Sequence, residues 1–307
     1  MNPEPGDELN NYPGGVSVIL ITGAAGLSGS IIVRHFSRQK TNVRALVRNP
    51  EKARQLQILP MVEVVQGDML RPETLGSALQ DVERVLMISS PNSRMVETQC
   101  TFIDACKKAG VPHIVKFSGT ELGVDPEKFR FMRMHNEIEH YLENSGVAWT
   151  HLRPSQFMQV YLREAPAIAA KEAIFLPMGN ARLEPVDIED IAEVAFSLLH
   201  SEGHEGKSYD MTGPESLTMT EVAARISSAI EKPVRYVNVP PEDHRKMLLE
   251  HRIPSFLADG VYELFAERRG RPDQPVLLRT HKLFGVRPTT FAEFALRNAT
   301  LFNGGKS

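Results

Sequence analysis

Three glycines, Gly23, Gly26 and Gly29, have the spacing and setting to bind a phosphate group. An apolar run over residues 16–21 precedes them, as in a buried parallel strand, and apolar residues at helical spacing follow. In such a strand–turn–helix, glycines permit the sharp turn and let a pyrophosphate approach free N–H groups at the helix start. A merely structural turn is the alternative. The pattern favours a dinucleotide-binding loop with the candidate contacts Gly23, Ala25, Gly26, Leu27, Ser28 and Gly29.

The residue at the end of the second strand indicates which dinucleotide is bound. An acidic residue roughly 20 positions after the glycines would bind a ribose 2′-hydroxyl, but Arg48 stands there instead. A guanidinium suits a 2′-phosphate, and Lys52 lies one helical turn further on. Arg44 is expected on the other face of this strand. The sequence therefore predicts NADP(H) rather than NAD(H), unless Arg48 and Lys52 are only solvated surface charges.

Polar residues also follow the third, fourth and fifth predicted strands. Ligands of open α/β sheets lie outside the carboxyl ends of the strands. We expect Asp68 to accept a hydrogen bond from the adenine amino group and Met69 to pack on the ring, although Asp is also common in turns. Ser89, Ser90 and Ser118 are expected along the ribose and nicotinamide, unless they only form turns.

The order of elements predicts the fold. Apolar, strand-like runs alternate with helical patterns through the first half, which is typical of a doubly wound α/β (Rossmann) fold with a parallel sheet. The expected strands cover residues 16–21, 42–47, 62–65, 82–89, 111–117 and 147–152, and the clearest helices cover 95–109 and 129–144.

The second half is less regular and predicts a smaller C-terminal α/β lobe that binds the substrate. We expect helices at 188–200, at 218–231 with Thr218 as N-cap, and over 241–270 with a break at Pro254, and strands at 207–211 and 234–239. The expected division is a flexible N-terminal extension (1–15), a nucleotide-binding domain (16–155) and a substrate lobe (156–307). The 187–200 helix and a short strand could pack back on the first domain.

Composition limits the function classes. The chain has 307 residues, 42% hydrophobic and 24% charged, as in an ordinary globular protein. A net charge of −3 gives no general attraction to nucleic acid, and no apolar run approaches the roughly 20 residues of a membrane span. Histidine and cysteine spacings match no common metal motif. Two cysteines and no signal-peptide pattern favour the cytoplasm, and a homo-oligomer stays open.

Several motifs together resemble the NmrA-like atypical short-chain dehydrogenase/reductases, over roughly residues 16 to 240. The resemblance implies NADP(H) at the glycine loop, Arg48, Lys52, Asp68 and Ser89–Ser90, with Pro154 and Phe157 flanking the nicotinamide. It implies either a reductase of quinones, dyes or other conjugated acceptors, or a non-catalytic redox-sensing regulator with a protein partner. A reductase of one specific biosynthetic intermediate is a third alternative. The motifs are Thr22–Gly29, Val47–Lys52, Gly67–Asp68, His135-x-x-x-Glu139-x-Tyr141, Ser145–Met158 and Val186–Ala192.

The catalytic residues depart from the standard pattern of short-chain dehydrogenases. No tyrosine is followed four positions later by lysine. The helix predicted over residues 129–144, which should supply this pair, has Phe131 and His135 instead, and many NmrA-like members keep a lysine at the position of His135. His135 and Ser118 are the catalytic candidates. His135 could donate a proton, bind the ribose or be a buried core residue, and Glu139, one turn on, could orient it.

Our leading hypothesis is an NADPH-dependent reductase that passes a hydride to a small conjugated acceptor resembling a quinone, imine or enone. The acceptor is expected in a cleft between the first lobe and the start of the second. Its candidate contacts are Gln156, Tyr161 and Met178.

Overall fold

The computed structural model describes residues 18–120, 125–270 and 273–305. The expected extension over residues 1–15 and the first two residues of the first strand lie outside these ranges.

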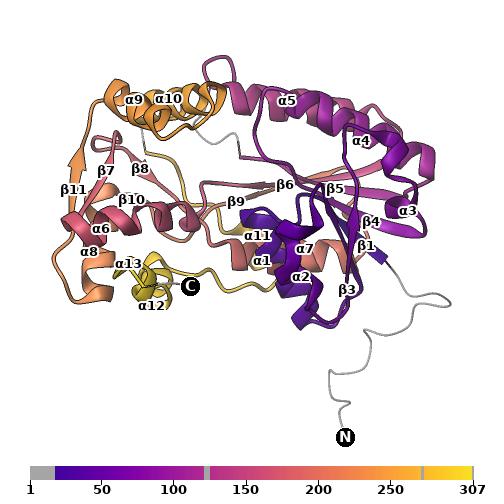
Figure 1. Ribbon diagram of the computed structural model, residues 1–307, viewed down its shortest axis with the longest axis horizontal. Helices are drawn as coiled ribbons and strands as arrows, with labels where there is room; N and C mark the ends of the chain where they lie inside the picture. Colours follow the sequence, from indigo (N-terminus) through magenta and orange to yellow (C-terminus); the bar gives the residue numbers. More distant parts are fainter. Residues whose placement is uncertain (1–17, 121–124, 271–272, 306–307) are drawn as a thin grey trace, which may run out of the picture.

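A seven-stranded parallel sheet forms the centre of the larger lobe (Figure 1). The strand order is β3-β2-β1-β4-β5-β6-β9, and every neighbouring pair is parallel. The order reverses between β1 and β4, and in a doubly wound sheet this point opens a crevice at the carboxyl ends of the strands. The strands are β1 (Val18–Ile21), β2 (Val43–Val47), β3 (Val62–Gln66), β4 (Val82–Met87), β5 (His113–Phe117), β6 (Ala148–Pro154) and β9 (Lys207–Met211).

Helices cover both faces of this sheet, as predicted for the fold. On one face, α1 (Leu27–Arg38) and α7 (Ile188–His200) pack together over a core that includes Ile32, Phe36 and Ile191. On the other face lie α3 (Gly76–Leu79), α4 (Met95–Ala109) and α5 (Arg130–Glu143), over Leu20, Val85 and Ile114. Four short elements complete this lobe: η1 (Pro50–Ala53), α2 (Arg54–Gln57), η2 (Pro72–Thr74) and α11 (Arg279–Leu283).

The second lobe has its own core, with Ile174, Leu183, Val222 and Phe294 among its buried residues. Two small sheets, β7–β11 and β8–β10, pack with helices at the opposite end of the molecule from α3 and α4 (Figure 1). Its elements are η3 (Met158–Glu164), α6 (Ala165–Lys171), β7 (Ala173–Leu176), β8 (Arg182–Leu183), β10 (Leu217–Thr218), α8 (Met219–Ile230), β11 (Arg235–Asn238), α9 (Pro241–Glu250), α10 (Ser255–Arg269), α12 (Phe291–Arg297) and α13 (Ala299–Phe302).

The long, periodic elements were predicted closely. The helices over 95–109 and 188–200 and the strand over 207–211 have the expected bounds, and the helices over 241–270 break at Pro254. Thr218 caps α8, since its hydroxyl accepts from the N–H of Glu221 at 3.2 Å. The fourth strand ends at Met87 rather than residue 89, and the fifth begins at His113 rather than residue 111.

The region after residue 155 does not stay in the second lobe. Strand β9 pairs with β6 along Thr150–Pro154, and α7 lies against α1. The sequence had left open that the 187–200 helix and a short strand pack back on the first domain. The short elements β7, β8, β10, η3 and α6 were not predicted, because each is too brief to show a hydrophobic period.

Within the described ranges, none of the helices has the length and apolar character needed to cross a membrane. The same residues contain no cluster of three or more His, Cys, Asp or Glu side chains able to hold a metal ion.

Candidate active site

The glycine turn after β1 is built so that side chains do not fit at two of its three glycines. Gly23 has φ +58°, and a Cβ there would lie 2.7 Å from the carbonyl oxygen of Ile88. A Cβ on Gly29 would lie 2.3 Å from the carbonyl oxygen of Gly23. Gly26 is the N-cap of α1 and offers no side-chain cap, so the N–H groups of the first helical turn stay available to an anion.

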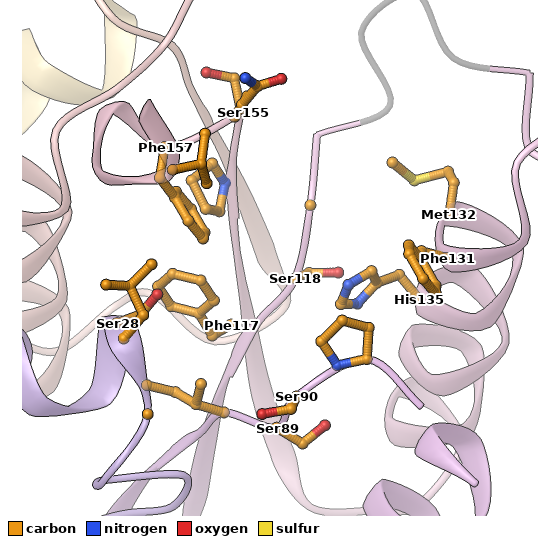
Figure 2. A pocket seen from close by; sticks show the side chains of 18 of the residues that line it. Ser28, Ser89, Ser90, Phe117, Ser118, Phe131, Met132, His135, Ser155 and Phe157 are labelled. Carbon is orange, nitrogen blue, oxygen red and sulfur yellow. The ribbon is translucent and has the colours of Figure 1, made fainter. Parts of the chain in front are cut away.

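Two cavities meet over this turn and share Gly23, Gly26, Ile88, Ser89 and Ser90. We call the first the β2 cavity; its volume is about 700 Å³, and it extends over the ends of β2 and β3. We call the second the α5 cavity; its volume is about 480 Å³, and it lies between the glycine turn, α5 and η3 (Figure 2). A long ligand bent over the glycine turn would fill both.

The predicted residues for the adenosine end line the β2 cavity: Ala25, Arg48, Lys52, Asp68 and Met69. One oxygen of Asp68 accepts from the N–H of Leu70 at 3.0 Å, so this carboxylate also stabilises its own turn. Arg44 lies on the other face of β2, as expected, where its Nε donates to Glu63 at 2.8 Å.

Arg94 is a further cation on the β2 cavity, and the sequence analysis missed it. Its guanidinium donates to both carboxylate oxygens of Glu97, each at 2.7 Å, which holds it in place. Arg94 precedes α4 in a loop, and no motif of the sequence marks it.

The α5 cavity has mainly apolar walls. In Figure 2, Phe117 and Phe157 lie on one side, with ring centroids 5.8 Å apart, and Phe131 and Met132 of α5 lie on the other. The predicted residues Leu27, Ser28, Gly29, Ser89, Ser90, Ser118, His135, Pro154, Gln156 and Phe157 all line this cavity.

Two expected substrate contacts need correction. Tyr161 and Met178 are each 1% exposed and belong to the core of the second lobe, not to the wall of either cavity. Met178 follows β7, where its N–H donates to the Tyr236 hydroxyl at 3.0 Å. For Tyr161 the reason is the 3₁₀ geometry of η3, in which residues three apart share a face. Phe157, Val160 and Arg163 therefore line the cavity, while Tyr161 points inward and its hydroxyl accepts from Gln156 Nε2 at 3.2 Å.

Lys116 of β5 lies directly behind His135 and Ser118, and its side chain is fully buried. Its Nζ lies 2.9 Å from Nδ1 of His135 and donates to Oγ of Ser118 at 3.1 Å. Burial lowers the pKa of Lys116 to about 7; the charge of Glu139 opposes this shift, and that of Arg153 adds to it. The sequence analysis missed this residue. The signal was a lysine within an apolar strand, since lysine is almost never fully buried without partners.

The contact with Lys116 fixes the state of the His135 ring. Burial and the charge of Lys116 hold the pKa of His135 well below its ordinary value, so the ring is neutral. The ammonium form of Lys116 can only donate, so Nδ1 accepts and the ring proton lies on Nε2. His135 thus lines the α5 cavity as a hydrogen-bond donor.

The expectation that Glu139 orients His135 is wrong, because its carboxylate has other partners. Nε of Arg153 donates to it at 3.1 Å, and the Ser118 hydroxyl also bonds to it. Burial alone would raise the pKa of Glu139, but these two hydrogen bonds and nearby positive charges keep it below its ordinary value. Glu139 therefore compensates the charges of Lys116 and Arg153.

A doubly wound sheet with a glycine turn, a basic cavity and an apolar cavity defines a dinucleotide-binding oxidoreductase. The chain belongs to the NmrA-like family, whose model matches residues 16–295.

Proteins of known activity resemble this chain over nearly its whole length. The NAD(P)H azoreductase of Xenophilus azovorans is 36% identical over 93% of this chain and 99% of its own. The NADPH-dependent quinone oxidoreductase of Escherichia coli, solved with NADPH, is 30% identical with a TM-score of 0.79, over 91% of this chain and 99% of its own. The triphenylmethane reductase of Citrobacter sp., solved with NADP(H), is 25% identical with a TM-score of 0.78, over 92% of this chain and 99% of its own.

Proposed function

We propose that this chain is an NADPH-dependent reductase that delivers a hydride to a small conjugated acceptor. The observation that best supports this proposal is that the β2 cavity and the α5 cavity adjoin over the glycine turn. Arg48 and Lys52 line the β2 cavity and would suit an adenosine 2′-phosphate, and the α5 cavity combines apolar walls with His135 and Ser118.

The residues of both cavities fit NADPH. The N–H groups at the start of α1, which no side chain caps, would bind the pyrophosphate, and Arg48 and Lys52 would bind the 2′-phosphate. Ser89 and Ser90 line both cavities, where they would contact the ribose on the nicotinamide side, and Pro154 and Phe157 would flank the nicotinamide.

When bound, NADPH supplies a hydride from C4 of its nicotinamide. The aromatic walls of the α5 cavity, Phe117, Phe131 and Phe157, exclude water and hold a planar acceptor. No Tyr-x-x-x-Lys pair is needed where the reduced acceptor spreads its negative charge over a conjugated system.

We propose His135 as the proton donor to the reduced acceptor. As Nε2 gives up its proton, Nδ1 can take one from the Lys116 ammonium 2.9 Å away, leaving a neutral amine. With its pKa near 7, Lys116 can lose this proton at neutral pH, which an ordinary lysine could not do readily.

The experiment is an acceptor panel with purified protein, comprising a quinone, an azo dye and a triphenylmethane dye. We expect NADPH to be oxidised with at least one of them. Tight NADPH binding without oxidation across the panel would overturn the reductase and favour the regulator. The reductase is preferred because the three relatives above are reductases or an oxidoreductase by name.

We further propose a small molecule as the partner and the cytoplasm as the compartment. Both cysteines are free thiols, Cys100 half-buried and Cys106 buried, which agrees with a reducing environment. Fractionation of the native protein tests the compartment, and sedimentation tests whether it forms a homo-oligomer.

A further inference from the structure

Two guanidinium groups bring positive charge to the α5 cavity. Among the described residues that line this cavity, Arg163 and Arg268 are the permanently charged side chains, and none is Asp or Glu. The other walls are mainly aromatic and aliphatic. A cavity of this composition favours a planar apolar molecule with a negative group at one end.

Local helix geometry places Arg163 on the cavity wall. In η3, three residues make one turn, so Val160 and Arg163 stand in one row, and both line the cavity together with Phe157, the N-cap of η3.

Arg268 reaches the same region from α10. Leu264 and Arg268 are four residues apart, share one helical face and both line the cavity. This helix is fixed against α5: a Cβ on Gly260 would lie 2.3 Å from the Phe131 ring, and Arg130 Nη2 bonds Glu263 at 2.5 Å. Arg268 therefore sits on a positioned element rather than on a free loop.

The carboxylates of Glu164 and Glu184 interact electrostatically with these guanidiniums, but they do not line the cavity. Burial raises the pKa of Glu164 and of Glu184. The charge of Arg163 opposes this rise at Glu164, and the charge of Arg268 opposes it at Glu184. Glu184 is itself buried and accepts from the Ser216 hydroxyl at 2.9 Å. Neither carboxylate lines the space that the acceptor would occupy.

We propose, on the basis of the reductase function above, that the acceptor is aromatic and carries a carboxylate or sulfonate that Arg163 and Arg268 bind. Guanidinium groups suit both anions, because two parallel N–H donors match two oxygens.

The test compares two acceptors that differ in one charge, 1,2-naphthoquinone and 1,2-naphthoquinone-4-sulfonate. The measured quantity is the kcat/KM for the sulfonate divided by the kcat/KM for the neutral quinone. Comparing this ratio between wild type and variants cancels the difference in intrinsic reactivity of the two quinones. We expect Arg163→Gln and Arg268→Gln each to lower this ratio about tenfold, as for loss of about 1.4 kcal/mol of ionic binding. Arg268→Lys keeps the positive charge and should lower the ratio less than Arg268→Gln does.

Arg269→Gln is the matched control, because Arg269 is the next residue and bonds the carbonyl oxygen of Pro177 and the side chain of Asn238 instead of lining the cavity. Its ratio should not change. Equal ratios in wild type, Arg163→Gln and Arg268→Gln would overturn the proposal.

A binding measurement separates this proposal from the reductase itself. Naphthalene-2-sulfonate and 2-naphthol are titrated into the protein saturated with NADP⁺, which needs no turnover. We expect the sulfonate to bind about tenfold more weakly to each variant and the naphthol to bind equally to all. Arginine-dependent sulfonate binding without NADPH oxidation would refute only the reductase, whereas sulfonate binding independent of both arginines would refute the anion site.

Discussion

At the residue scale, Arg48 is the side chain to which we assign the preference for NADPH over NADH. It replaces the acidic residue that would bind a ribose hydroxyl, and it lines the β2 cavity beside Lys52. We expect Arg48→Glu to weaken NADPH binding about 10- to 100-fold and to leave NADH binding within a few fold, because only NADPH carries the 2′-phosphate. Fluorescence titration of both dinucleotides measures this.

Arg54→Glu is the control for this substitution, since Arg54 is exposed on α2 and does not line either cavity. It makes the same change of charge nearby. Equal loss of NADPH and NADH binding in Arg48→Glu would remove the 2′-phosphate assignment.

The buried Lys116 gives a pH dependence with a definite sign. If Lys116 resupplies the His135 proton, kcat falls as the pH rises through about 7, where Lys116 loses its proton. Lys116→Met should lower kcat at pH 6 and abolish this fall. His135→Gln should lower kcat about 10²-fold or more for an acceptor whose product needs a proton. The measurement is kcat against pH at saturating NADPH.

Lys107→Met, an exposed change on α4, is the control and should keep the wild-type profile. Because Lys116 is buried, NADPH affinity and melting temperature must be measured alongside. An unchanged pH profile in folded Lys116→Met would exclude the relay.

The glycine turn is the element whose geometry matters most. A Cβ on Gly29 would overlap the carbonyl oxygen of Gly23, so the start of α1 would have to move away from β1. We expect Gly29→Ala to lower the free energy of unfolding by about 1–3 kcal/mol and to weaken NADPH binding strongly. Chemical denaturation and dinucleotide titration check both effects.

Gly76→Ala is the matched control, because an added Cβ there meets nothing within 4 Å. It should leave stability and binding nearly unchanged. Normal NADPH affinity in Gly29→Ala would contradict the role given to close helix–strand packing.

At the scale of the whole molecule, the first lobe depends on later parts of the chain. Strand β9 completes the main sheet, and α7 supplies Ile188, Ile191, Val194 and Leu198 to the core around α1. A fragment ending at residue 155 would expose this apolar face to water. We expect residues 16–155 alone to lack cooperative unfolding and NADPH binding, as measured by circular dichroism and titration.

The full chain is the control and should show both properties. Cooperative unfolding of the fragment, with retained NADPH affinity, would instead support an independent nucleotide-binding domain that ends at residue 155.

The sequence by itself determined the doubly wound fold, the glycine turn and the cation at the end of β2. These features are local, because strand and helix periods, glycine spacing and the residue ending a strand are all properties of neighbouring positions. All of the cofactor contacts predicted in this way line one or both of the two adjoining cavities.

Only the tertiary structure decided what surrounds the nicotinamide end. Lys116 and His135 are 19 positions apart and meet because β5 packs against α5. Arg163 of η3 and Arg268 of α10 line the same cavity, and the turn of η3 buries Tyr161. These contacts depend on how helices and strands that are far apart in the sequence pack together. Local hydrophobic periodicity does not predict such packing.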